Sequence, residues 1–175
     1  YDHILFLVVL TVPYFFRDWK RLLLLVSSFT LGHTLSLLLG VYDIINLKAN
    51  VTEWLIPFTI IIMAIYNVFT SGKASKYGNS IIIFSLVLFF GFIHGLGFAN
   101  AFESLVSSSE STLLSVLEFA IGIEVGQFVI VFCILFFGFL GQTIFRFSLR
   151  DWVMVISSIV IGLMLPLIFN SPLFS

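Results

Sequence analysis

Long apolar runs alternate with short polar segments along almost the whole chain. A hydrocarbon core of about 30 Å takes about 20 helical residues to cross, whereas the strands of a membrane barrel would show apolar residues at every second position. The runs lack that alternation and are of helical length. They therefore predict an all-α, polytopic membrane helix bundle of about six transmembrane helices, the first one cut short, over residues 1–16, 21–41, 54–70, 80–103, 114–140 and 152–169.

The composition indicates a single transmembrane domain over residues 1–175 whose outer surface faces the lipid bilayer. Hydrophobic residues make up 60% of the chain and charged residues only 10%, whereas a soluble domain carries roughly a quarter charged residues. The net charge of −1, without a basic tract, argues against nucleic acid as a partner. The sequence contains no Walker-type phosphate loop and no dinucleotide fingerprint. Its single cysteine, Cys133, excludes an internal disulfide and a cysteine-based metal cage.

The charges of the connecting segments alternate in a way that predicts the orientation in the membrane. The first, third and fifth connections hold seven of the eight lysines and arginines, whereas the fourth holds two glutamates and no base. Basic loops stay in the cytoplasm by the positive-inside rule. The loops after the first, third and fifth helices are therefore expected to be cytoplasmic; their basic residues are Arg17, Lys20, Arg21, Lys73, Lys76, Arg146 and Arg150.

A small set of strongly polar side chains lies deep inside the predicted spans. An ionisable group at that depth costs at least ~2.5–3.5 kcal/mol, so it commonly marks a pathway or a site. At about 1.5 Å per residue from the cytoplasmic helix ends, His3 and His33 lie ~20 Å deep, and His94 and Glu124 lie ~21–24 Å deep. Four helices thus place a ligand-type side chain at one level. The full set is Asp2, His3, His33, His94, Glu124 and Gln127.

The residue types in this set indicate a metal site. Imidazole and carboxylate ligands suit divalent nickel, cobalt or zinc, whereas copper(I) would want sulfur ligands. Neighbouring Asp2 and His3 point about 100° apart on a helix, so one would bind while the other orients a partner. Glu124 and Gln127, three residues apart, share a helix face. We therefore expect a nickel, cobalt or zinc ion to bind within the membrane at this set of residues.

The same positions also have purely structural interpretations. His33 would be a neutral side chain hydrogen-bonded across helices, as polar groups in membrane bundles often are. The glycines around His94, in FGFIHGLGFAN, indicate either close helix packing or a broken or kinked helix whose carbonyls become ligands. Gly122 and Gly126, beside Glu124, fit a small-xxx-small helix contact.

Four strings, DHILFL, FTLGHTLSL, FGFIHGLGFA and IGIEVGQ, stand in this order on separate predicted helices. Together they resemble the HupE/UreJ family of small bacterial membrane proteins, from Tyr1 to about Leu140. The resemblance implies a permease-like protein of six to seven helices in the bacterial inner (cytoplasmic) membrane. It also implies a link to nickel or cobalt supply for metalloenzymes such as hydrogenase and urease.

The family's polar motif positions fall on the same residues that depth selects. The family usually has a further histidine several residues before the Asp-His pair of its first helix, and this sequence begins after that position. The resemblance therefore implies a ligand set of which one member lies outside the sequence. Carried over in order, the motif residues are Asp2 and His3, His33, His94, and the pair Glu124 and Gln127.

Three functions are compatible with these residues. The preferred one is a nickel- or cobalt-type divalent cation permease, or a metal-binding membrane protein, in which Asp2 or Glu124 couples metal binding to proton release. The second is an intramembrane zinc-dependent hydrolase, since three histidines and a carboxylate can hold zinc with one position open for water. The third is a structural subunit of a larger membrane complex, partnered by other membrane subunits or by further copies of the chain.

The shape of the site would separate the first two functions. A permease needs polar lining towards both faces of the membrane, whereas a hydrolase needs a cleft that opens to lipid or to one side only. We prefer the transporter over the enzyme and assign no catalytic residue.

Overall fold

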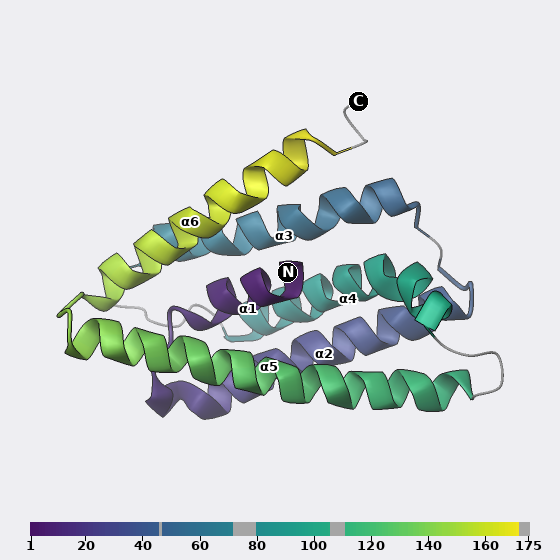
Figure 1. Ribbon diagram of the computed structural model, residues 1–175, viewed down its shortest axis with the longest axis horizontal. Helices are drawn as coiled ribbons and strands as arrows, with labels where there is room; N and C mark the ends of the chain where they lie inside the picture. The colour runs from purple at the N-terminus through teal and green to yellow at the C-terminus, as the bar shows by residue number, and fades with distance from the viewer. Residues whose placement is uncertain (46, 72–79, 106–110, 172–175) are drawn as a thin grey trace.

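Each of the six predicted apolar runs forms an α-helix in the computed structural model of the protein (Figure 1). The structure describes residues 1–45, 47–71, 80–105 and 111–171, and these contain no strand. The helices are α1 (Asp2–Thr11), the short 3-10 helix η1 (Phe16–Asp18), α2 (Trp19–Val41), α3 (Ala49–Thr70), α4 (Ser80–Leu105), α5 (Thr112–Thr143) and α6 (Leu149–Phe169).

Five of these helices, α2 to α6, are long and apolar enough to cross a membrane. The exception is α1, whose 10 residues span about 15 Å, or half of the hydrocarbon core. The prediction of an all-α membrane bundle with a short first helix is confirmed. The orientation in the membrane stays a prediction, since helix length and hydropathy do not show which face is cytoplasmic. Lys73 and Lys76 of the third connection lie outside the described residues.

The short helix α1 lies in the middle of the bundle, where it contacts α3, α5 and α6 (Figure 1). Its side chains Phe6, Leu7, Val9 and Leu10 are at most 1% exposed. A helix that is apolar on all sides is stable only when other helices surround it, and α1 is surrounded in this way. A buried hydrogen bond also links α1 to α3, because the Asn67 side chain of α3 donates to the Val9 carbonyl of α1 at 2.6 Å.

Glycines let α2 and α4 pack with their backbones in direct contact. A Cβ atom added to Gly91 would overlap the Phe29 carbonyl, and one added to Gly95 would overlap the His33 carbonyl. In the other direction, a Cβ on Gly32 would overlap the Leu88 carbonyl. The glycines around the α4 histidine therefore serve close packing. The alternative of a broken helix with free carbonyls is wrong, since α4 runs as one helix from Ser80 to Leu105.

The helices α5 and α6 form the most exposed side of the bundle, with only 22% of the apolar window of each buried. At the end where they are joined, Trp152 packs across Gly138 and Gly141. Gly122 and Gly126 lie elsewhere on α5, and among the described residues nothing comes within 4 Å of a Cβ built on either. The expected small-xxx-small contact at this pair is therefore wrong for the described helices of the chain.

Candidate functional site

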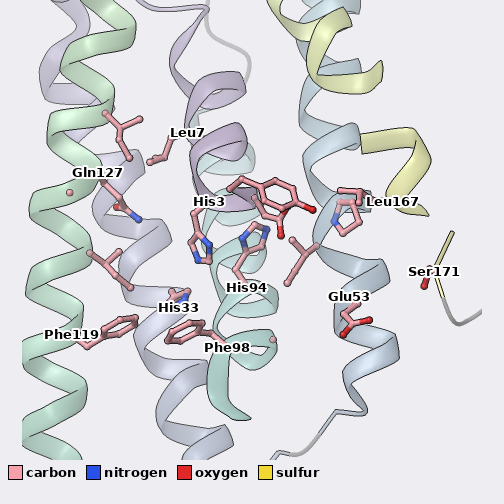
Figure 2. Close-up of a pocket in the computed structure, with 18 of the residues that line it drawn as sticks. His3, Leu7, His33, Glu53, His94, Phe98, Phe119, Gln127, Leu167 and Ser171 are labelled. Atoms are coloured by element: carbon pink, nitrogen blue, oxygen red, sulfur yellow. The ribbon is translucent and has the colours of Figure 1, made fainter. Parts of the chain in front are cut away.

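The three histidines, which are far apart in sequence, come together inside the bundle (Figure 2). The His3 ring lies 5.2 Å from the His33 ring and 5.1 Å from the His94 ring, measured between centroids, and it meets both edge to face. The side chains of His33 and His94 are 1% and 0% exposed. The cluster therefore joins α1, α2 and α4 at one level of the bundle.

The close α2–α4 contact positions two of these rings. Gly95 follows His94 directly and packs against the His33 backbone. The Ser36 hydroxyl donates a hydrogen bond to the His33 carbonyl at 3.0 Å and lies against the same glycine. With no side chain at this position, the two helices approach closely enough for both histidines to reach the His3 ring.

The histidines line the central part of a cavity of about 770 Å³, with Gln127 on one side of them and Glu53 on the other (Figure 2). The cavity continues from the cluster towards the end of the bundle where α3 begins and α6 ends, past Glu53 and Ser171 (Figure 2). Its described lining includes the carboxylates of Asp2 and Glu53 and no lysine or arginine. Such a lining favours cations over anions.

Five buried polar atoms at this cavity have no hydrogen-bond partner among the described residues. Buried polar groups in proteins are nearly always paired, so unpaired ones point to a water, an ion or a function. All five belong to residues selected from the sequence, and all five residues line the cavity. The atoms are Asp2 Oδ1, His3 Nε2, His33 Nε2, His94 Nδ1 and Gln127 Nε2.

A threonine of α3 determines which nitrogen of His94 is free. The Thr59 hydroxyl donates its only hydrogen to the Ile56 carbonyl at 2.8 Å. The contact of 3.3 Å between Thr59 Oγ1 and His94 Nε2 must then have the imidazole nitrogen as its donor. This tautomer leaves Nδ1 with a lone pair, which is the form in which a histidine binds a metal.

Gln127 of α5 can present either end of its amide to the cavity. The Thr30 hydroxyl lies 3.0 Å from Gln127 Oε1 and 3.3 Å from the Val26 carbonyl. If Thr30 donates to Val26, it can accept from the amide nitrogen, and the amide oxygen then faces the cavity. The Gln127 side chain can therefore donate a hydrogen bond to a water molecule through its amide nitrogen or offer its amide oxygen to a cation.

Glu124 is the one selected residue that the structure does not bring to the cavity. Its carboxylate accepts a hydrogen bond from the Ser27 hydroxyl at 2.5 Å, which ties α5 to α2. Depth along a helix selects Glu124, but depth does not say which way a side chain faces.

Several residues at the site escape prediction from the sequence. Thr59 carries no distinctive signal, because hydroxyl residues are common in membrane helices. Glu53 has the pattern of an ordinary loop charge, although it lines the cavity. Phe98 and Phe119 stack on each other at 5.0 Å and lie 6.3 and 6.4 Å from the His33 ring, so they form an aromatic wall of the site.

The rings touch, but they are not arranged as a finished coordination sphere. Within the part of the chain that the structure describes, no three His, Cys, Asp or Glu side chains are placed to hold one metal ion together. The edge-to-face packing of the His3 ring on its two neighbours is the visible reason. Lone pairs are available at the cavity, but they do not converge on one point.

Comparison with known proteins assigns the chain to a family. A family model described as "HupE / UreJ protein" matches residues 1–170. Neither the curated proteins nor the solved structures contain a match. Because the matched segment includes all six helices and every cavity residue except Ser171, this membrane protein belongs to the HupE/UreJ family.

Proposed function

We propose that the protein is a permease for a divalent transition metal ion of the nickel or cobalt type, bound on its way at the histidine cluster. Family membership supports a metal-related role in a membrane. The observation that carries the proposal is the group of five unpaired buried polar atoms at one cavity. In this proposal the metal ion is the transported substrate.

The chemistry of the donors favours this class of ion. The cavity offers imidazole nitrogens from His3, His33 and His94 and oxygens from Asp2 and Gln127. Nitrogen and oxygen donors suit nickel, cobalt and zinc, whereas copper(I) selects thiolate and thioether. No sulfur-containing side chain lines the cavity in the described part of the chain.

Binding requires the rings to turn. Coordinating nitrogens sit about 2.0–2.1 Å from a zinc-sized ion, so ligands around one ion are much closer together than edge-to-face rings allow. Rotation about the side-chain bonds of His3 and His33 would aim their free Nε2 atoms into the cavity. The site would thus be assembled by its ion, which suits a carrier that must also release it.

The cavity walls support passage of a cation from one face. Glu53, exposed at the mouth, would attract the ion, and Asp2 lies further in beside His3. A carboxylate must be ionised to bind a metal, so metal binding at Asp2 would release a proton whenever that group is protonated. With the orientation inferred from the basic loops, the mouth faces the outside of the bacterial inner membrane.

One observation favours the zinc hydrolase as a second candidate. A cavity of about 770 Å³ is large enough for an organic substrate. Three histidines and Asp2 would hold the zinc ion, which would activate a water molecule. A purely structural role has less support, because structural polar groups in membrane bundles are paired with each other.

Metal content tests the proposal directly. The wild type, purified in detergent and incubated with nickel, cobalt or zinc, is compared by elemental analysis with His33→Ala, His94→Ala and Asp2→Asn. Glu118→Asn is a matched carboxylate control, because Glu118 is exposed on α5 and does not line the cavity. We expect about one nickel or cobalt ion per chain in the wild type and control, and none in the histidine variants. Absence of metal from the wild type contradicts the proposal, and retention of zinc alone favours the hydrolase.

A further inference from the structure

Each histidine of the cluster has a phenylalanine one helical turn away. The offset is three residues forward in α1 and four residues backward in α2 and α4. Because α1 runs in the opposite direction to α2 and α4, all three offsets point to the same end of the bundle (Figure 1). This is the end where α1 stops and α2 and α4 begin, and the pairs are His3 with Phe6, His33 with Phe29, and His94 with Phe90.

The three phenylalanines pack into one aromatic layer. The Phe6 ring stacks on Phe29 at 4.7 Å and meets Phe90 edge to face at 6.1 Å. Their side chains are 0%, 0% and 3% exposed, and none of them lines the cavity. Phe29 also contacts His94 at 5.2 Å, so the layer lies directly against the histidines. The three rings are in contact, so they leave no room for a hydrated ion between them, and the cavity reaches the layer at Leu7.

Polar groups occur again at the end of the bundle beyond this layer. Thr11, at the end of α1, and Ser157 of α6 are both 0% exposed, and their hydroxyls have no hydrogen-bond partner among the described residues. Asn67, near the end of α3, is 1% exposed. Buried polar side chains inside a membrane are costly and commonly mark a pathway. From the histidines towards this end of the bundle, the aromatic layer therefore comes first and the inner polar groups follow.

We propose that Phe6, Phe29 and Phe90 form the inner gate of the metal path. This inference rests on the proposed permease function and adds the residues that control passage. A hydrophobic constriction stops ions by excluding their water. The structure then represents the state in which the site opens towards the beginning of α3 and is closed at the other end. Release of the ion requires the phenylalanines to separate, as expected for alternating access.

The gate is tested by measuring ion flux and metal binding on the same variants. Wild type, Phe29→Ala and Phe29→Leu are reconstituted in vesicles that contain a metal-sensitive dye, and nickel is added outside. Phe137→Ala is the matched control, because Phe137 is 60% exposed on the lipid side of α5. Elemental analysis, helical circular dichroism and elution volume show whether each variant binds metal and remains folded.

We expect Phe29→Ala to raise the passive nickel flux about tenfold, the factor that corresponds to about 1.4 kcal/mol off a barrier. Its metal content should stay at the wild-type value, and Phe29→Leu should restore a low flux because it restores bulk. Phe6→Ala provides a second variant if Phe29→Ala does not fold. Wild-type flux in a folded, metal-binding alanine variant overturns the gate alone. A wild type that binds no metal overturns the proposed function and the gate together.

Discussion

At the scale of single residues, the hydrogen bond between Thr59 and His94 determines which ring nitrogen of His94 keeps a free lone pair. Because Thr59 gives its hydrogen to the Ile56 carbonyl, it acts as an acceptor for the imidazole and leaves Nδ1 free. Such partners of ligating histidines fix the tautomer and the ring orientation. In the proposed metal site, Thr59 would therefore be a positioning residue that does not itself bind the ion.

Replacing Thr59 with valine should weaken metal binding while the fold is kept. The change removes the hydroxyl at nearly constant volume, and loss of such a partner typically costs 10–100-fold in metal affinity. Equilibrium dialysis with nickel would measure this, and Thr59→Ser should restore most of the affinity. Thr52→Val is the matched control, because among the described residues the Thr52 hydroxyl bonds within α3, to the Ala49 carbonyl at 2.9 Å. Equal weakening in both valine variants would contradict the assigned role.

Glu124 should be separable from the metal site. Its carboxylate bonds to Ser27 between α5 and α2 and does not line the cavity. Glu124→Gln keeps an oxygen that can accept the Ser27 hydrogen bond, so it should bind the same amount of metal as the wild type. Elemental analysis beside Asp2→Asn checks this. Loss of metal from Glu124→Gln would restore Glu124 to the ligand set expected from its depth.

At the scale of helices, the sequence predicts that a helix is present more reliably than it predicts which face of the helix is buried or where the helix begins and ends. Apolar length alone locates all six helices, although α1 ends at Thr11 instead of residue 16. Two other helices are longer than their apolar runs, since α3 begins at Ala49 instead of residue 54 and α5 extends to Thr143 instead of residue 140. Polar residues at the membrane boundary continue a helix without adding hydropathy, so the apolar run underestimates its length. α5 is apolar all round, and its sequence therefore could not show that Gln127 faces the cavity and Glu124 does not.

The α2–α4 contact should be the least tolerant of added volume. In Gly91→Ala the new methyl group would meet the Phe29 backbone, which cannot move aside as a side chain can. Overpacking of this kind typically costs 1–3 kcal/mol. We therefore expect a lower thermal unfolding temperature in detergent. Gly162→Ala on α6 is the control, since its methyl group meets nothing within 4 Å among the described residues, and equal unfolding temperatures would contradict the account.

At the scale of the whole molecule, depth counted along straight helices is enough to predict that the three histidines share one level. The count succeeds because His3, His33 and His94 lie on helices that run along one axis of the bundle (Figure 1). It cannot give the ring orientations, the aromatic layer or the cavity, since these depend on how the helices are turned about their axes. In the sequence, Gly95 is only one glycine of the string around His94, and that string does not show that α2 and α4 approach each other closely at this position.

The orientation can be tested by labelling from one side of the membrane. In a variant with Cys133 replaced by serine, Glu53→Cys should react with an impermeant thiol reagent added outside, and Arg146→Cys should react only after the cells are opened. Both positions are exposed in the structure. The expectation follows from the basic loops, which the positive-inside rule places in the cytoplasm. The reverse labelling pattern would invert the proposed direction of the cavity.

X-ray absorption of the nickel-loaded protein would show whether the histidine cluster binds the metal, because it reports the atoms bound to the ion. We expect a shell of nitrogen and oxygen donors with the outer-shell scattering of two or three imidazoles, and loss of the imidazole signal in His33→Ala and His94→Ala. A shell that contains sulfur, or one of oxygens alone that is unchanged in both variants, would show that the histidine cluster is not where the metal binds.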